Sequence, residues 1–121
     1  MKPFPFLLCL MSFLSCKAAD FRSVDADSFV QVIEDTTVVR LDVRTANEYT
    51  QGHIPGALLI DVTQADFMQK AEQLLPKDKT IALYCRSGRR SKTAAQLLAK
   101  QGYQVIELNT GFNSWKGEVE R

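Results

Sequence analysis

Apolar and polar residues follow one another along this chain in a pattern that predicts strands and helices in turn. Helical spacing predicts a short helix from Ala26 to Glu34, with Phe29 and Ile33 on its apolar face. Residues 23–25 offer capping groups immediately before this helix. Runs of β-branched and aliphatic residues predict strands at 37–43, 57–60, 80–84 and 104–108.

Two later segments also carry helical spacing. The first has its apolar residues over 67–75 and ends before Pro76, because proline cannot continue a helix. The second runs over 91–101, and Gly102 follows it as a helix stop. Residues 45–56 interrupt the pattern with a polar stretch and a glycine-containing turn.

This alternation predicts the fold class. Parallel strands need crossover connections, which bring helices onto the sheet. We therefore expect an α/β fold, a three-layer sandwich whose central, mostly parallel sheet has about five strands and helices on both faces. Ligands of such sheets bind beyond the carboxyl ends of the strands. Cys85 directly follows the predicted strand 80–84 and is therefore expected at that edge.

The beginning of the chain differs from the rest. Lys2 precedes an apolar run, Phe4–Leu14, which is too short to cross a bilayer, where roughly 20 apolar residues are needed. The pattern is typical of an export signal, so residues 1–19 are predicted to be a signal and residues 20–121 to form one domain. We expect the mature protein in the periplasm or cell envelope.

Two ways of processing this signal remain open, besides its retention in the mature chain. Cleavage after Ala18 or Ala19 would release a soluble protein, since a signal peptidase accepts small residues there. Alternatively, residues 13–16 resemble a bacterial lipoprotein signal, which would make Cys16 a lipid-anchored N-terminus. In either case Cys85 is the only cysteine outside residues 1–19, and it has no partner there for a disulfide.

Charge and composition exclude several classes of partner. The 121 residues include 15 Lys and Arg against 14 Asp and Glu, so no overall field attracts nucleic acid. The chain has a single histidine and no cluster of His and Cys with metal-ligand spacing. We therefore expect no nucleic-acid partner and no metal site.

The segment after the third predicted strand carries the candidate chemistry. Cys85 enters a loop that contains Gly88 and leads into the predicted helix 91–101. Main-chain N–H groups and the helix dipole bind anions at a helix start and favour a thiolate over a thiol. A cysteine in such a place can have its pKa lowered from about 8.5 to between roughly 3.5 and 7.5. Cys85 is thus a candidate nucleophile.

Four cations surround this loop, although the helix dipole disfavours positive charge at a helix start. They are Arg86, Arg89, Arg90 and Lys92. A local rule broken at one place usually marks a functional site, and here it favours a small anionic substrate. The candidate substrate-binding residues are Arg86, Ser87, Gly88, Arg89, Arg90 and Ser91.

From Leu41 to Trp115 the sequence resembles a single rhodanese domain. The resemblance rests on four segments, which are Asp42-Val43-Arg44 with Glu48-Tyr49, residues 52–57, residues 85–91, and Gly111 with Trp115. Their order and spacing make the resemblance specific. The sequence departs from the family at Asn109-Thr110-Gly111, where paired glycines are more usual, and this puts the shape of the last loop in doubt.

The resemblance implies a sulfurtransferase that needs no cofactor. Cys85 would attack the outer sulfur of thiosulfate or a related persulfide donor and become a persulfide, which the loop 86–91 would cradle with N–H groups. A thiol, or cyanide in the test tube, would then remove the sulfur in a ping-pong reaction. The expected partners are therefore a small anionic sulfur donor and a thiol acceptor, which is a small molecule or a protein.

Other residues of the matching segments have supporting interpretations. Asp42 and Arg44 are expected to form an ion pair that orders the loops near the site. His53 belongs to a turn that the family uses structurally, so its partnership with the cysteine is disfavoured. Trp115 is expected to pack under the last loop.

Three alternative functions stay open. A phosphatase or arsenate reductase also holds a thiolate in an anion loop, but tyrosine-phosphatase-like loops place an arginine six positions after the cysteine, where this chain has Ser91. A non-catalytic rhodanese-like binding module is disfavoured because Cys85 is present. A sulfur carrier or thiol-redox module of the cell envelope would differ in its donor and acceptor and would keep the same nucleophile.

Overall fold

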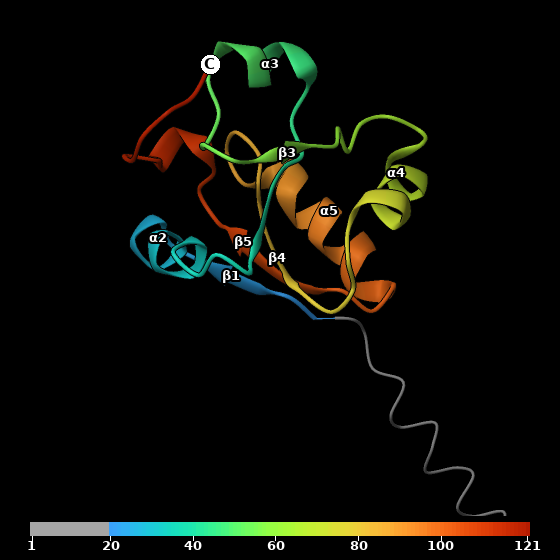
Figure 1. Cartoon of the computed structure of the whole chain (residues 1–121). Coiled ribbons are helices and arrows are strands. Elements are labelled where there is room, and N and C mark those ends of the chain that lie inside the picture. Colours follow the sequence, from blue (N-terminus) through green and yellow to red (C-terminus); the bar gives the residue numbers. More distant parts are fainter. Residues whose placement is uncertain (1–19) are drawn as a thin grey trace, which may run out of the picture.

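Five parallel strands form one sheet in the computed structural model, which describes residues 20–121 (Figure 1). Along the sheet the order is β1-β5-β4-β2-β3, and every pair of neighbours is parallel. The strands are β1 (Arg22–Val24), β2 (Val39–Asp42), β3 (Leu58–Leu59), β4 (Thr80–Tyr84) and β5 (Gln104–Leu108). The predicted parallel α/β sheet is thereby confirmed. The predicted signal, with Cys16, Ala18 and Ala19, lies outside the described residues.

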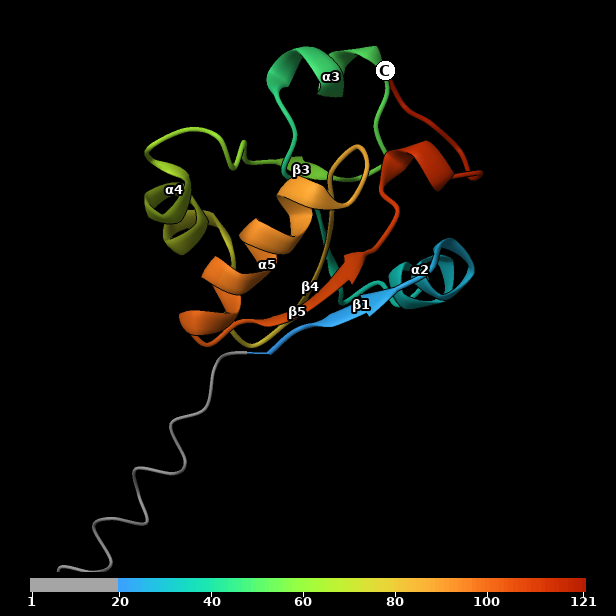
Figure 2. The same ribbon diagram turned by 180° about the vertical axis from the view of Figure 1, so that it is seen from behind.

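Helices cover both faces of this sheet and give the three layers expected. α4 and α5 lie on one face and α2 lies on the other, while α3 lies beyond the carboxyl ends of the strands (Figure 1, Figure 2). The helices are α2 (Ala26–Ile33), α3 (Ala46–Gln51), α4 (Phe67–Leu74), α5 (Arg89–Lys100) and the 3-10 turn η1 (Phe112–Ser114). Within residues 20–121 no helix is long and apolar enough to cross a membrane.

The central strand β4 is buried on both faces and ends directly before Cys85. Ile81 and Leu83 of β4 point into the core under α4 and α5, as does Cys85, whereas Ala82 and Tyr84 point into the core under α2. All five are fully buried. A strand buried on both faces reads as a continuous apolar run, because alternate side chains face opposite sides of the sheet.

The first helix forms as its pattern predicts. Asp25 caps α2 by accepting a hydrogen bond from the main-chain N–H of Ser28 at 2.9 Å, which satisfies one of the free N–H groups of the first turn. Phe29 and Ile33, four residues apart, are buried under the sheet.

The structure contains two elements, β1 and α3, that the apolar pattern of the sequence did not predict. Residues 22–24, of which 23 and 24 were interpreted only as capping groups, form the edge strand β1, which pairs with β5. Its side chains are exposed or half-buried, so it shows no apolar run. The polar stretch before the turn forms α3, which buries no side chain and therefore has no apolar periodicity. The sequence feature that marks the start of α3 is the capping box of Thr45 and Glu48. The main-chain N–H of each residue donates a hydrogen bond to the side-chain oxygen of the other.

Candidate active site

Cys85 lies directly after β4, and the residues that follow turn into the start of α5. The main-chain N–H of Gly88 donates a hydrogen bond to the Cys85 Sγ at 3.1 Å. Gly88 is the N-cap residue of α5 and has φ of 102°, in the left-handed region that glycine tolerates best. The helix begins at Arg89, two residues before the predicted start, so the loop is shorter than expected.

The surroundings of Cys85 favour the thiolate. Burial alone would raise the pKa of Cys85, because removal from water disfavours a charge. Hydrogen bonds from the Ser91 hydroxyl and from the main-chain N–H groups of Ser91, Gly88 and Ser87 act in the opposite direction and prevail. The pKa of Cys85 therefore lies below its ordinary value, as expected of a nucleophile at a helix start.

The Cys85 side chain is buried, and its orientation separates a nucleophile from an inert core cysteine. Cys85 has 0% of its surface exposed, which an inert core cysteine would also show. However, its Sγ faces the N–H groups of its own loop and does not point away from them. Access of any reactant to this sulfur therefore requires a movement of the loop or a rotation of the side chain.

The four cations expected at the loop divide into separate sets. Arg86 and Arg90 both bind the carboxylate of Glu48 in α3, with N–O distances of 2.9 Å for Arg86 and of 2.8 and 3.0 Å for Arg90. Lys92 binds Glu107 in β5 at 3.2 Å. Arg89 is exposed and forms no ion pair within the described residues. Only Arg89 therefore offers its full charge to an incoming anion.

Glu48 and Glu107 are the charged residues that the sequence analysis missed as parts of the site. Glu48 belongs to a segment of the family resemblance, but its sequence position gave no reason to pair it with a loop some forty residues later. Hydrogen bonds from Arg90, stronger than the opposing effect of burial, hold the pKa of Glu48 far below its ordinary value of 4.5.

This lowered pKa predicts how stability depends on pH. The Glu48 contribution is fully present above pH 4.5, the ordinary value, and is lost as the pH falls toward the lower native value. We expect Glu48→Gln to reduce the free energy of unfolding by about 1 kcal/mol at pH 7, since its partners are partly exposed. The difference from wild type should shrink in urea titrations below pH 4.5. Glu72→Gln, from an exposed ion pair, is the control, and equal losses in both variants would contradict the prediction.

Asp42 and Arg44 form the expected ion pair at the carboxyl end of β2. The Arg44 Nη2 lies 2.7 Å from Asp42 Oδ2, and the two side chains are 2% and 0% exposed. Arg44 also donates to the carbonyl of Gly52 at 2.7 Å, and its guanidinium lies 4.5 Å from the ring centre of Phe112. The pair thus links the turn after α3 to the segment after β5, which agrees with a supporting role.

His53 is bound within the scaffold. Its Nδ1 donates to the carbonyl of Tyr49 at 2.9 Å, and the two rings stack with centres 3.7 Å apart. Its Nε2 lies 3.4 Å from Glu120, in an isolated antiparallel bridge that holds the end of the described chain. Both ring nitrogens therefore have partners away from Cys85, as the interpretation of the turn anticipated.

Trp115 also packs rather than facing the thiol. Its side chain lies against the apolar core under α2, and its indole N–H donates to the carbonyl of Glu118 at 2.9 Å. This is the packing expected under the last loop.

The departure from paired glycines leaves the last loop intact. Gly111 has φ of 68°, and a Cβ there would lie 2.3 Å from the Arg86 carbonyl oxygen, so only glycine fits at this position. The N–H of Phe112 donates to the carbonyl of Cys85 at 2.8 Å, which fastens this loop to the nucleophile. Thr110 is exposed, and in residues 20–121 no residue other than glycine has positive φ. The side chain at 110 is therefore accommodated.

The close approach at Gly88 carries a strong prediction. A Cβ at Gly88 would lie 2.0 Å from the carbonyl oxygen of Asn109, in addition to the cost of positive φ. We expect Gly88→Ala to lower the free energy of unfolding by about 1–3 kcal/mol and to slow alkylation of Cys85 by displacing the N–H groups. Gly102→Ala is the matched control, because Gly102 also has positive φ but has open space around it. An unchanged alkylation rate in Gly88→Ala would be evidence against the loop geometry.

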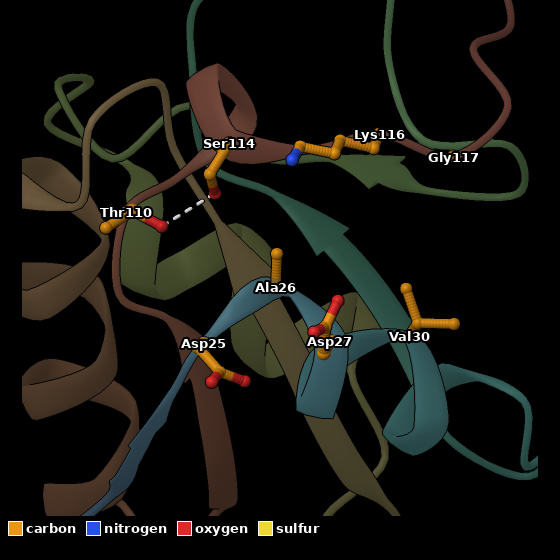
Figure 3. A pocket seen from close by; sticks show the side chains of 8 residues that line it. All are labelled: Asp25, Ala26, Asp27, Val30, Thr110, Ser114, Lys116 and Gly117. Atoms are coloured by element: carbon orange, nitrogen blue, oxygen red, sulfur yellow. Dashed lines mark hydrogen bonds between the residues drawn. The ribbon is translucent and has the colours of Figure 1, made fainter.

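A separate hollow of about 460 Å³ lies between the start of α2 and the segment after β5 (Figure 3). Asp25, Asp27 and Lys116 line it, and Thr110 donates to Ser114 at its edge. Its lining does not include the Cys85 loop. In the part of the chain that the structure describes, no three His, Cys, Asp or Glu side chains gather in the manner of metal ligands.

Fold and site together define a domain with a cysteine between the carboxyl end of a parallel strand and the start of a helix. The profile of the rhodanese-like domain family matches residues 25–118. The chain belongs to the rhodanese-like domain family. A solved structure of a rhodanese-related protein from Thermoplasma volcanium is similar, with a TM-score of 0.72 and 26% identity, over 83% of this chain and 98% of that one.

Several curated proteins are similar in sequence. A sulfurtransferase of Allochromatium vinosum is 37% identical over 96 residues, which cover 78% of this chain and 87% of that protein. The thiosulfate sulfurtransferase GlpE of Shewanella oneidensis is 32% identical over 99 residues, covering 80% and 94%. YrkF of Bacillus subtilis, named a candidate sulfur carrier protein, is 34% identical over 105 residues, and the match spans 55% of its length.

Proposed function

We propose that this protein transfers a sulfane sulfur from thiosulfate, or from a related persulfide donor, to a thiol or cyanide through a Cys85 persulfide. The observation that carries the proposal is the Cys85 Sγ, which accepts a hydrogen bond from the Gly88 N–H at the start of α5 and has a lowered pKa. Relatives named sulfurtransferase and thiosulfate sulfurtransferase support it.

The proposed reaction has two displacements. The Cys85 thiolate bonds to the outer sulfur of thiosulfate, and the bond between the two donor sulfurs breaks, so that its electron pair leaves with sulfite. An acceptor thiolate or cyanide then bonds to the outer sulfur, and Cys85 leaves as a thiolate. Residues 86–91 are proposed to hold the bound sulfur with their N–H groups, and Asp42 with Arg44 is proposed to keep the neighbouring loops in place.

Intact mass spectrometry before and after incubation with thiosulfate tests this function. The wild-type chain should gain one sulfur atom at the Cys85 peptide and lose it when cyanide is added. The same treatment with an aryl phosphate should leave the phosphate intact, since Ser91 occupies the position at which tyrosine-phosphatase-like loops have arginine. Turnover of the phosphate without sulfur uptake would overturn the proposal, and so would an unmodified Cys85.

A sulfur carrier is the second candidate, and the similarity to YrkF favours it. A carrier would also hold sulfur on Cys85, but it would accept sulfur poorly from thiosulfate and would take it from another donor. Repeated formation of thiocyanate from thiosulfate and cyanide therefore separates a thiosulfate sulfurtransferase from a carrier. A non-catalytic module would show neither loading nor release.

Arg89 is predicted to attract anionic donors. We expect Arg89→Glu to lower kcat/KM for thiosulfate by about tenfold at low salt and to affect an uncharged donor much less. The difference should shrink at high ionic strength, because exposed charges are screened. Lys100→Glu, at the far end of α5, makes the same charge change away from the loop and serves as the control. Equal losses with both kinds of donor would remove Arg89 from anion attraction.

We also propose that the protein works in the periplasm or cell envelope. The basis is the sequence of residues 1–19 alone, with cleavage near residues 15–19 or lipidation of Cys16. Cell fractionation and the intact mass of the mature protein test this proposal. Recovery of the unprocessed chain from the cytoplasm would contradict it.

A further inference from the structure

Two arginines of the loop after β4 converge on one carboxylate from another part of the chain. The Glu48 Oε2 accepts hydrogen bonds from Arg86 Nε at 2.9 Å and from Arg90 Nη2 at 3.0 Å, and its Oε1 accepts from Arg90 Nη1 at 2.8 Å. Two guanidinium groups that meet at one oxygen repel each other unless an anion lies between them. The two arginines therefore form an anion site, which the Glu48 carboxylate fills.

This anion site lies beside the candidate nucleophile. Arg86 directly follows Cys85, and Arg90 lies in the first turn of α5. The N-cap residue of that helix, Gly88, donates its N–H to the Cys85 Sγ. Glu48 comes from α3, which lies beyond the carboxyl ends of the strands (Figure 1). An oxyanion that replaced the carboxylate on both guanidinium groups would therefore lie next to the loop that carries the sulfur.

The Glu48 side chain keeps other partners when it leaves the arginines. Its Oε1 also accepts hydrogen bonds from the main-chain N–H and the hydroxyl of Thr45, each at 3.1 Å. This capping box lies within α3 and needs no arginine, so the helix start is preserved when the ion pairs break. Since α3 has no fully buried side chain, a shift of this helix exposes less apolar surface than a shift of a core helix.

The arginines can be reached from water. The side chains of Arg86 and Arg90 are 52% and 28% exposed, against 15% for Glu48. Arg86 binds the carboxylate through Nε, and among residues 20–121 its two Nη groups have no hydrogen-bond partner. An anion from solution can therefore bind these Nη groups first and then take the place of the carboxylate.

We propose that Glu48 is a specificity-determining residue that occupies the position of the donor's oxyanion, so that a doubly charged donor such as thiosulfate must displace it from Arg86 and Arg90 before the outer sulfur reaches the nucleophile. A guanidinium group binds carboxylate and sulfonate oxygens through the same planar fork. Glu48 therefore competes with every anionic donor and does not compete with an uncharged one. The donor's identity rests on the proposed function, whereas the anion site itself does not. No covalent bond changes in the exchange.

Binding of sulfate to the full chain tests the exchange, because sulfate resembles the oxyanion end of thiosulfate and has no sulfur to transfer. We expect calorimetry at low ionic strength to give Glu48→Gln a dissociation constant at least about tenfold lower than that of wild type, since glutamine keeps the size of the side chain but not its charge. Glu72→Gln makes the same charge change in an exposed ion pair and should alter the constant less than about twofold. Unchanged or weaker binding to Glu48→Gln would overturn the proposal.

A second substitution locates the gain in affinity. Arg90→Gln, added to the Glu48→Gln chain, removes one of the two guanidinium groups and should abolish the gain. Lys100→Gln, added to the same chain, removes a positive charge at the far end of α5 and should preserve the gain. A gain that survives Arg90→Gln would show that sulfate binds elsewhere, which would also contradict the proposal.

NMR titration of the wild-type chain does not depend on the folding of any variant. As sulfate is added, the signals of the Arg86 Nε–H and of the Glu48 carboxyl carbon should shift with one midpoint, equal to the calorimetric dissociation constant. If the Glu48 signal stayed in place while the Arg86 signal moved, the anion would bind beside the carboxylate and no exchange would occur.

The effect on specificity is measured with two sulfur donors. In Glu48→Gln, the kcat/KM for thiosulfate relative to that for an uncharged organic trisulfide should rise at least about tenfold. An unchanged ratio together with tighter sulfate binding would show that Glu48 does not select donors. The sulfate experiments involve no sulfur transfer, so a chain that binds sulfate as expected but never loads sulfur would refute the proposed function and leave the anion site established.

Discussion

Cys85→Ser is expected to abolish sulfur transfer, with a loss of at least about a thousandfold in the rate of thiocyanate formation from thiosulfate and cyanide. A serine hydroxyl is a far weaker nucleophile than a thiolate at neutral pH, and the hydrogen bonds that lower the Cys85 pKa do not ionise an alcohol. Stopped assays of thiocyanate measure the rate, and intact mass measures the missing sulfur.

The fold should survive this change, because serine is close to cysteine in volume. The circular dichroism spectrum and the cooperativity of unfolding are therefore expected to match wild type, which separates loss of chemistry from loss of structure. Thr36→Ala, an exposed change in the loop after α2, serves as the control for the manipulation itself. Transfer that persisted in Cys85→Ser would exclude Cys85 from the mechanism.

Asp42→Ala is expected to lower the free energy of unfolding by about 3–5 kcal/mol. The change leaves the Arg44 guanidinium, 2% exposed, without the carboxylate that it contacts at 2.7 Å. It also leaves the main-chain N–H of Arg44 without its acceptor, the Asp42 Oδ1 at 2.9 Å. Urea denaturation of both chains at pH 7 measures the difference.

An exposed ion pair of the same chain provides the matched control. Asp66 and Lys70 lie 3.6 Å apart on α4, with about half of each side chain in water. Asp66→Ala should change the free energy of unfolding by well under about 1 kcal/mol, because exposed pairs contribute little. Similar small losses in both variants would show that Asp42 and Arg44 do not hold the two loops together.

Burial and hydrogen bonds explain why much of the fold was predictable. The continuous apolar run of β4 and the one-sided spacing of α2 reflect how many faces of each element are covered, and that can be read along the chain. β1 and α3 bury no side chain, so their apolar pattern is absent. β1 is held by main-chain bonds to β5, a partner more than eighty residues away.

The candidate nucleophile could be identified for a local reason. A cysteine after a buried strand, a glycine that accepts positive φ and the start of a helix all lie within a few consecutive residues, so their chemistry follows from their order. The neighbouring cations were also visible, but their pairing was not. Glu48 of α3 forms ion pairs with two of these cations, Arg86 and Arg90. Those contacts depend on the position of α3 over the carboxyl edge of the sheet.

What the sequence by itself determined is therefore the class of fold, the position of the candidate nucleophile and the excess of positive charge beside it. The tertiary structure decided which of those charges remain free, and that the thiol is covered although it faces its loop. It also brought Glu107 from the last strand to the hydroxyl of Ser91 in the first turn of α5. The physical reason is that strand and helix patterns come from neighbours in sequence, whereas an ion pair or a buried hydrogen bond joins side chains that only the packing of distant elements brings together.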